Sequence, residues 1–208
     1  MRLIGLDLSL TGPGIAMIDD GRVVTIAVKV PAKLRDVPRL DWILDAVKTW
    51  ADEGCLAVLE GPSYGSQAGQ AGHHERAGLW WITYRMLAHR DIPTAVVPPS
   101  NLKGYATGKG NADKTAMCMA AVRRFEPLGV AVPDDDNAVD ALWLAAMGAA
   151  ALGTPVVDLP QKQTEHVGRV PWPTAFTTIL EEARHARPAA RPTPDGPGPS
   201  GRYRCPPR

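Results

Sequence analysis

The chain has 208 residues, 45% hydrophobic and 22% charged, so it is long enough for one domain with a substantial core. It contains no apolar run of 18 residues and no signal-peptide pattern at its start, so we expect neither a membrane span nor secretion. The three cysteines are scattered and form no CxxC pair, which favours free thiols in a reducing, cytoplasmic setting.

The net charge of +1 conceals an asymmetry between the body of the chain and its end. Residues 183–208 hold six arginines and one aspartate (+5), which leaves −4 on residues 1–182. Bulk charge therefore does not indicate a nucleic-acid-binding protein, and such a function must come from local patches. Because seven of the last 21 residues are proline, residues 185–208 are predicted to form a disordered Pro/Arg-rich tail.

The first half of the chain predicts a strand meander followed by alternating helices and strands. Residues 2–8, 14–19 and 23–30 are apolar segments separated by turn-forming residues. A helix is predicted at 40–54, and LAVLEG at 56–61 is typical of a strand buried on both faces.

The second half predicts further alternation and then helices. A glycine-rich loop at 61–74 leads to a helix at 75–90, a strand at 94–98 and a loop at 99–114, and helices follow at 112–125 and 136–152. This order predicts an α/β domain with a mixed sheet and helices on its faces, spanning residues 1–153. Residues 154–184 are predicted to be a C-terminal extension.

Acidic residues occupy the points where these elements could meet. Asp7 lies in the first strand, Glu60 ends the fourth, and the last helix carries Asp136 at its start and Asp140 one turn further. Carboxylates gathered at one sheet edge repel one another unless a divalent cation lies between them. Oxygen ligands favour Mg²⁺ or Mn²⁺, and two such ions about 4 Å apart can bind both the attacking water and the leaving oxygen of a phosphodiester.

Each acidic residue also has a simpler interpretation. Asp7 could cap the following turn, Glu60 could be a solvated strand end, and one of the aspartates at 134–136 could cap the last helix. None of these accounts for Asp140, which lies inside an apolar helical segment. The joint pattern is therefore more specific than any single member.

Four segments together resemble the motifs of RuvC-type Holliday junction resolvases, including the shorter phage-encoded ones, in the ribonuclease H-like superfamily. These segments, within residues 2–152, are GLDLSLTGPGIAMID, VLEGPSYG, GKGNADK and DDDNAVDALWLA. The resemblance implies a ribonuclease H-like mixed sheet, made of an antiparallel meander plus parallel strands. It also implies a metal-dependent endonuclease that resolves four-way or branched DNA by paired cuts, with two Mg²⁺ or Mn²⁺ ions per site.

By this resemblance, Asp7, Glu60 and Asp140 take the places of three metal-binding carboxylates. The fourth family position falls three residues before Asp140, at Asn137, where the family often has an acid or a histidine. Asp136, four residues before Asp140, is therefore the candidate fourth ligand, and Asn137 is a departure from the family pattern.

A basic segment is the second candidate feature. Lys103, Lys109 and Lys114 lie between the fifth predicted strand and the next helix, and the resemblance implies that they contact the DNA backbone. Lys114, at the helix start, is also expected to act in catalysis. The alternative is a solvated helix start capped by Asn111. Tyr64 is a candidate for stacking on junction bases.

The resemblance further implies a homodimer. The predicted helix at 75–90 has more apolar surface than one stripe requires, through Leu79, Trp80, Ile82 and Leu87, and is the candidate dimer helix. Three alternatives stay open: a nuclease of this fold acting on RNA, a non-catalytic DNA-binding protein, and an ATP-binding kinase-like protein. The kinase-like alternative is disfavoured because no second repeated half follows residue 153.

Overall fold

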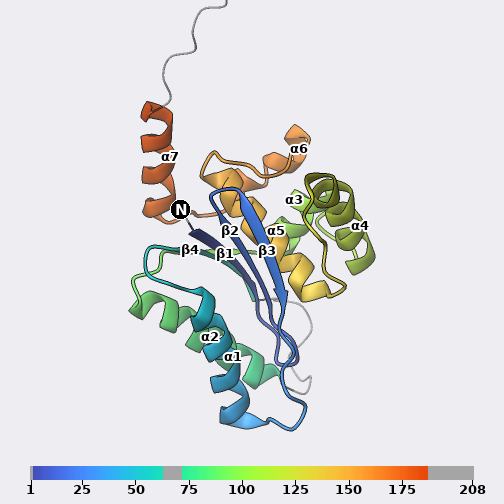
Figure 1. Cartoon of the computed structure of the whole chain (residues 1–208), viewed down its shortest axis with the longest axis vertical. Helices are drawn as coiled ribbons and strands as arrows, with labels where there is room; N and C mark the ends of the chain where they lie inside the picture. Colours follow the sequence, from blue (N-terminus) through green and yellow to red (C-terminus); the bar gives the residue numbers. More distant parts are fainter. Residues whose placement is uncertain (1, 63–71, 187–208) are drawn as a thin grey trace, which may run out of the picture.

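The computed structural model describes residues 2–62 and 72–186 (Figure 1). The predictions for Tyr64, for most of the 61–74 loop and for nearly all of the Pro/Arg-rich tail fall on residues outside these ranges.

A five-stranded mixed sheet forms the centre of the molecule. The strand order is β3-β2-β1-β4-β5, in which β1, β2 and β3 pair antiparallel while β1, β4 and β5 pair parallel. This confirms the predicted sheet, although the third strand is shorter than the predicted 23–30. The strand bounds are β1 Arg2–Asp7, β2 Gly14–Asp19, β3 Arg22–Ala27, β4 Leu56–Glu60 and β5 Thr94–Val97.

Helices cover both faces of this sheet. Helices α1 and α2 lie on one side and α5 on the other, with α3 and α4 packed beyond α5 (Figure 1). Alternation along β1 explains the two layers, because Leu3 faces α5 while Ile4 faces α1 and α2. The bounds are α1 Asp36–Trp50, α2 His73–His89, α3 Pro99–Thr107, α4 Lys114–Phe125, α5 Asp136–Ala151, α6 Gln161–Thr164 and α7 Thr174–Ala186, with 3₁₀ turns η1 Glu126–Leu128 and η2 Val167–Arg169.

Helix α5 is the central helix, and over residues 141–149 it is apolar on every side because it is covered on every side. Its sheet-facing side is close to the backbone of β1 and β2. A Cβ on Gly5 would overlap the carbonyl oxygen of Ala141, and one on Gly14 would overlap the backbone of Asn137. On its outer side, Trp143 donates a hydrogen bond to the Met117 carbonyl of α4. The glycines therefore set how closely the start of α5 approaches the sheet.

The prediction of a loop over 99–114 is wrong, because residues 99–107 form α3. Pro99 occupies the first turn, where its fixed φ suits a helix and its missing N–H costs nothing. Leu102 and Tyr105 then pack into the core, and Tyr105 donates to the Ala146 carbonyl of α5 (3.2 Å). The next helix is capped by Asp113, whose side chain accepts from Ala116 N, and not by Asn111.

The C-terminal part of the described chain, from Val156 to Ile179, packs on the same core as the sheet. Val157, Leu159, Val170 and Phe176 are buried in the cluster that contains α5. The boundary at residue 153 between the domain and a C-terminal extension stays a prediction. Within the described residues, no helix is both long and apolar enough to cross a membrane.

Candidate active site

The ends of β1 and β4 place Asp7 and Glu60 next to each other. The parallel pairing brings Leu6 beside Leu59, so the residues that follow each of them are neighbours. Both belong to the set of alternate positions that faces α5, as Leu3 and Val58 do. The register of two central strands thus brings the first two predicted carboxylates together.

The pKa values of Asp7 and Glu60 are both raised, chiefly by burial. Burial raises the pKa of Asp7 well above its ordinary 3.8, and the charges of Glu60 and Asp140 raise it further. Burial, followed by the charge of Asp140, raises the pKa of Glu60 to about 7. A side-chain hydrogen bond links the two groups, so the two carboxyl groups share a proton.

Asp140 joins this pair from the first turns of α5. Burial raises its pKa to about 6, and the charge of Lys103 opposes that shift most strongly. Lys103 also lowers the pKa of Glu60. The structure thus gathers three of the predicted carboxylates with Lys103 from α3, a helix in the segment predicted to be a loop.

The aspartates before Asp140 divide into distinct roles. Asp135 is the N-cap of α5, and its side chain accepts from Ala138 N (3.0 Å). Asp136 forms an ion pair with Lys114 (2.8 Å), and this hydrogen bond raises the pKa of the lysine. Asn137 donates from Nδ2 to the Gly12 carbonyl (2.7 Å), which ties the start of α5 to the turn after β1.

The donor set agrees in its chemistry with a divalent cation. Three carboxylates with raised pKa values carry a mutual repulsion that a cation would relieve. As the side chains lie, however, no group of three or more Asp, Glu, His or Cys among the described residues is arranged closely enough to hold one. Metal ligation needs ionised carboxylates, so cation binding would displace the proton that Asp7 and Glu60 share.

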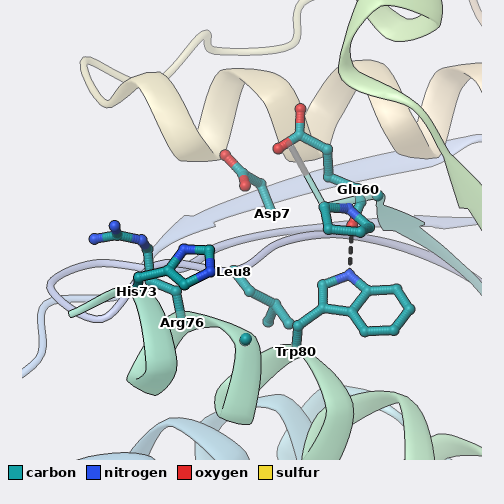
Figure 2. A pocket seen from close by; sticks show the side chains of 9 residues that line it. Asp7, Leu8, Glu60, His73, Arg76 and Trp80 are labelled. Carbon is teal, nitrogen blue, oxygen red and sulfur yellow. Dashed lines mark hydrogen bonds between the residues drawn. The ribbon is translucent and has the colours of Figure 1, made fainter. Parts of the chain in front are cut away.

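A cavity of about 220 Å³ opens beside the two strand ends. Figure 2 shows the carboxyl groups of Asp7 and Glu60 directed away from α2, while His73, Arg76 and Trp80 come from α2 itself. Trp80 donates from Nε1 to the Glu60 carbonyl (2.8 Å). The sequence predicts Trp80 only as part of the candidate dimer helix and does not predict this support of Glu60, although a partly buried indole N–H usually finds an acceptor.

The three predicted lysines do not act as one patch. Lys103 and Lys114 influence the carboxylates, whereas Lys109 is exposed on the 108–113 connection and lines a separate hollow of about 510 Å³. Arg123 and Arg124 of α4 also line that hollow. The structure therefore separates the basic segment into a part at the carboxylates and a part away from them.

Comparison with known proteins gives a consistent set of relatives. The Crossover junction endodeoxyribonuclease RuvC of Nocardia farcinica is 33% identical over 154 residues, which cover 70% of this chain and 79% of that protein. The protein of the same name from Rhodococcus jostii is 36% identical over 151 residues, with 70% and 79% covered. No protein-family model matches the chain.

Solved structures agree with the fold. The RuvC structure of Thermus thermophilus aligns with a TM-score of 0.53 at 18% identity, covering 76% of this chain and all of that one. RuvC from the same organism in complex with a Holliday junction substrate aligns with a TM-score of 0.55, also at 18% identity, over 76% of this chain and 99% of that one.

Proposed function

The chain belongs to the RuvC family of crossover junction endodeoxyribonucleases, and from that premise we propose that it hydrolyses phosphodiester bonds at the crossover of four-way DNA junctions. The observation that supports this most directly is the meeting of Asp7, Glu60 and Asp140 where two parallel strands end beside the start of α5. A family name alone would fit a non-catalytic member, but three mutually repelling carboxylates, one buried and two partly buried, impose a cost on folding that a merely structural role does not require.

We propose Asp7, Glu60 and Asp140 as metal ligands, with Asp136 as the fourth, and Mg²⁺ or Mn²⁺ as the ion. Two such ions, when bound, would supply an activated water and stabilise the leaving oxygen. Asn137 donates from Nδ2 to the Gly12 carbonyl, which ties its side chain to the turn after β1, and the charged carboxylate of Asp136 is the stronger candidate for the fourth position. To serve in that way, the Asp136 carboxylate must leave Lys114.

We further propose that Lys114 exchanges its partner when DNA binds. Its ammonium group is mostly exposed while it pairs with Asp136, so a DNA phosphate can replace the carboxylate without a change of fold. Lys103, on α3, acts on Glu60 and Asp140 and offsets their negative charge toward an anionic substrate. Lys109, away from the carboxylates, is assigned to backbone affinity and not to catalysis.

We propose that two copies act together in the bacterial cytoplasm. A four-way junction has two-fold symmetry, so two related cuts need two sites at a fixed separation, which a C2 dimer supplies. Trp81 on α2 is 63% exposed, and its neighbour Trp80 stacks on Tyr84. An exposed indole beside an aromatic stack supports α2 as the dimer helix.

A cleavage assay on four substrates tests the proposed function. The full-length protein is incubated with a four-way junction, a fork, a flap and an RNA–DNA hybrid, in Mg²⁺, in Mn²⁺ and in EDTA. We expect paired nicks in the junction with metal and none in EDTA, and the Asp7→Asn protein purified in parallel serves as the control. Preferential cutting of the hybrid would favour the RNA alternative, whereas junction binding with no cleavage in either metal would favour the non-catalytic one.

A further inference from the structure

Residues 157–176 cross the outer side of α3. Both ends of this C-terminal segment are fixed in the core, through Val157 and Leu159 at one end and Val170 and Phe176 at the other. Between these anchors, α6 and η2 contact α3 and α5, and His166 lies at the point where the segment passes over α3.

His166 contacts α3 in two ways. Its ring occupies the space that a side chain at position 104 would take, since a Cβ on Gly104 would overlap the imidazole. Its Nδ1 is 2.8 Å from Asn101 Oδ1, and Asn101 Nδ2 donates to the His166 carbonyl at 3.2 Å. Because the amide oxygen can only accept, Nδ1 carries the hydrogen, and the two residues form a matched pair of hydrogen bonds.

Helix α3 depends on such contacts for its position. It has nine residues with a glycine inside, and a helix that short has little stability of its own. Leu102 and Tyr105 pack it against the core on one side, and the contacts of Asn101 and Gly104 hold it on the other. Gln163 adds a hydrogen bond from the same segment to the Ala106 carbonyl.

In the sequence of α3, Lys103 lies between Asn101 and Gly104, the two residues that His166 contacts. It is the α3 residue whose charge acts on Glu60 and on Asp140, so any rotation of α3 changes the distance of a cation from both carboxylates. Resting on the proposed nuclease function, we propose that His166 is a positioning residue: by packing on Gly104 and pairing with Asn101 it fixes α3 and thereby holds Lys103 at the carboxylates.

A double-mutant cycle on the full-length protein tests this role. His166→Ala should lower the single-turnover cleavage rate on a four-way junction, at saturating protein, by about tenfold, since small displacements of positioned groups cost this much or more. Its junction affinity in EDTA should be unchanged. His166→Asn, whose Nδ2 can donate where Nδ1 does, should recover most of the rate. In a Lys103→Ala background, His166→Ala should have no further effect on the rate.

A stability control separates positioning from general destabilisation. Phe176→Leu disturbs the same C-terminal segment in the core, where it contacts Trp172, and should lower the melting temperature yet leave the rate unchanged. The proposal is overturned if His166→Ala cuts at the wild-type rate, if its loss is equally large without Lys103, or if Phe176→Leu loses as much rate. A wild-type protein that cuts no branched DNA overturns the proposed function itself, and the positioning role with it.

Discussion

The two faces of the sheet are built in opposite ways. On one face, α5 is buried along 12 of its 16 residues and lies against the backbone of Gly5 and Gly14. On the other, α1 buries two residues and α2 buries three, through larger side chains such as Val47 and Leu87. All the proposed carboxylates lie on the first face, two at strand ends and two at the start of α5.

The difference shows which helix of the fold is held most rigidly against the sheet. Backbone-to-backbone contact leaves α5 almost no freedom, so the position of Asp140 relative to Asp7 is fixed to within the tolerance of packed atoms. Side-chain packing on the second face leaves α2 with an exposed Trp81, a surface available to a partner. The following predictions, from the largest expected effect to the smallest, test this division.

The largest effect is expected at the carboxylates of the α5 face. Asp7→Asn, Glu60→Gln and Asp140→Asn should each lower the junction cleavage rate by about a thousandfold or more, because each removes a proposed metal ligand at constant volume. Gel-shift titration in EDTA should show nearly unchanged binding. Any one variant that cuts at close to the wild-type rate would remove that residue from the proposed ligand set.

A glycine on each face gives a matched pair for stability. Gly5→Ala should lower the free energy of unfolding by about 3 kcal/mol or more, since the new methyl group would displace α5. Gly78→Ala should raise it by about 0.5–1 kcal/mol, because Gly78 lies inside α2 with open space around it. Urea unfolding measures both. Equal effects of the two changes would show that the faces are packed alike.

The α5 face should also make the metal-free protein less stable as the pH rises from about 4 to about 7. The pKa of Glu60 is raised from 4.5 to about 7 and that of Asp140 from 3.8 to about 6, and the pKa of Asp7 is raised as well. In this window the folded state keeps protons that the unfolded chain has lost, so each increase in pH favours unfolding. The melting temperature in EDTA should therefore fall by roughly 5 °C or more across the window.

Two comparisons check the source of that slope. Asp7→Asn should flatten it, because the substitution removes a titrating group whose pKa is raised in the folded protein. Mg²⁺ added above pH 7 should raise the melting temperature of the wild-type protein more than that of the variant. An identical slope in both proteins would place the titration elsewhere.

Substitutions of Asp136 and Asn137, at the start of α5, should distinguish a metal ligand from a residue that stabilises the fold. Asn137→Ala should lower stability by about 1–2 kcal/mol, since the Gly12 carbonyl loses its donor. Asp136→Asn should leave stability nearly unchanged but lower the cleavage rate, by about ten- to a hundredfold. A silent Asp136→Asn beside a folded but inactive Asn137→Ala would move the fourth ligand to position 137.

The smallest effect is expected at Lys109. Lys109→Ala should weaken junction binding a few-fold and reduce the slope of log affinity against log salt by about one unit, as for one lost phosphate contact. Its single-turnover rate should stay at the wild-type value, in contrast to a reduced rate for Lys114→Ala. Lys48→Ala, on α1 of the opposite face, is the control and should change neither. Unchanged binding for Lys109→Ala would show that Lys109 is a solvated residue without a DNA contact.

Much of the fold and the carboxylate set could be predicted from local patterns. Alternating apolar residues place strands, helical spacing places α5, and an aspartate inside an apolar helix signals a site because burial of a lone carboxylate is costly. The helix α3 was missed because Pro99, Gly104 and Gly108 read as loop residues, and only contacts from residue 166 show why Gly104 belongs in a helix.

The sequence by itself determined the strand order of the meander and the buried helix at the end, and it predicted Asp7, Glu60 and Asp140 as a set, because these depend on periodicity and on residue type. Tertiary structure alone decided which of Asp136 and Asn137 is tied to the turn after β1, which lysines act on the carboxylates, and that Trp80 supports Glu60. Those choices depend on distances between elements far apart in the chain, and such distances are set by packing rather than by any local pattern.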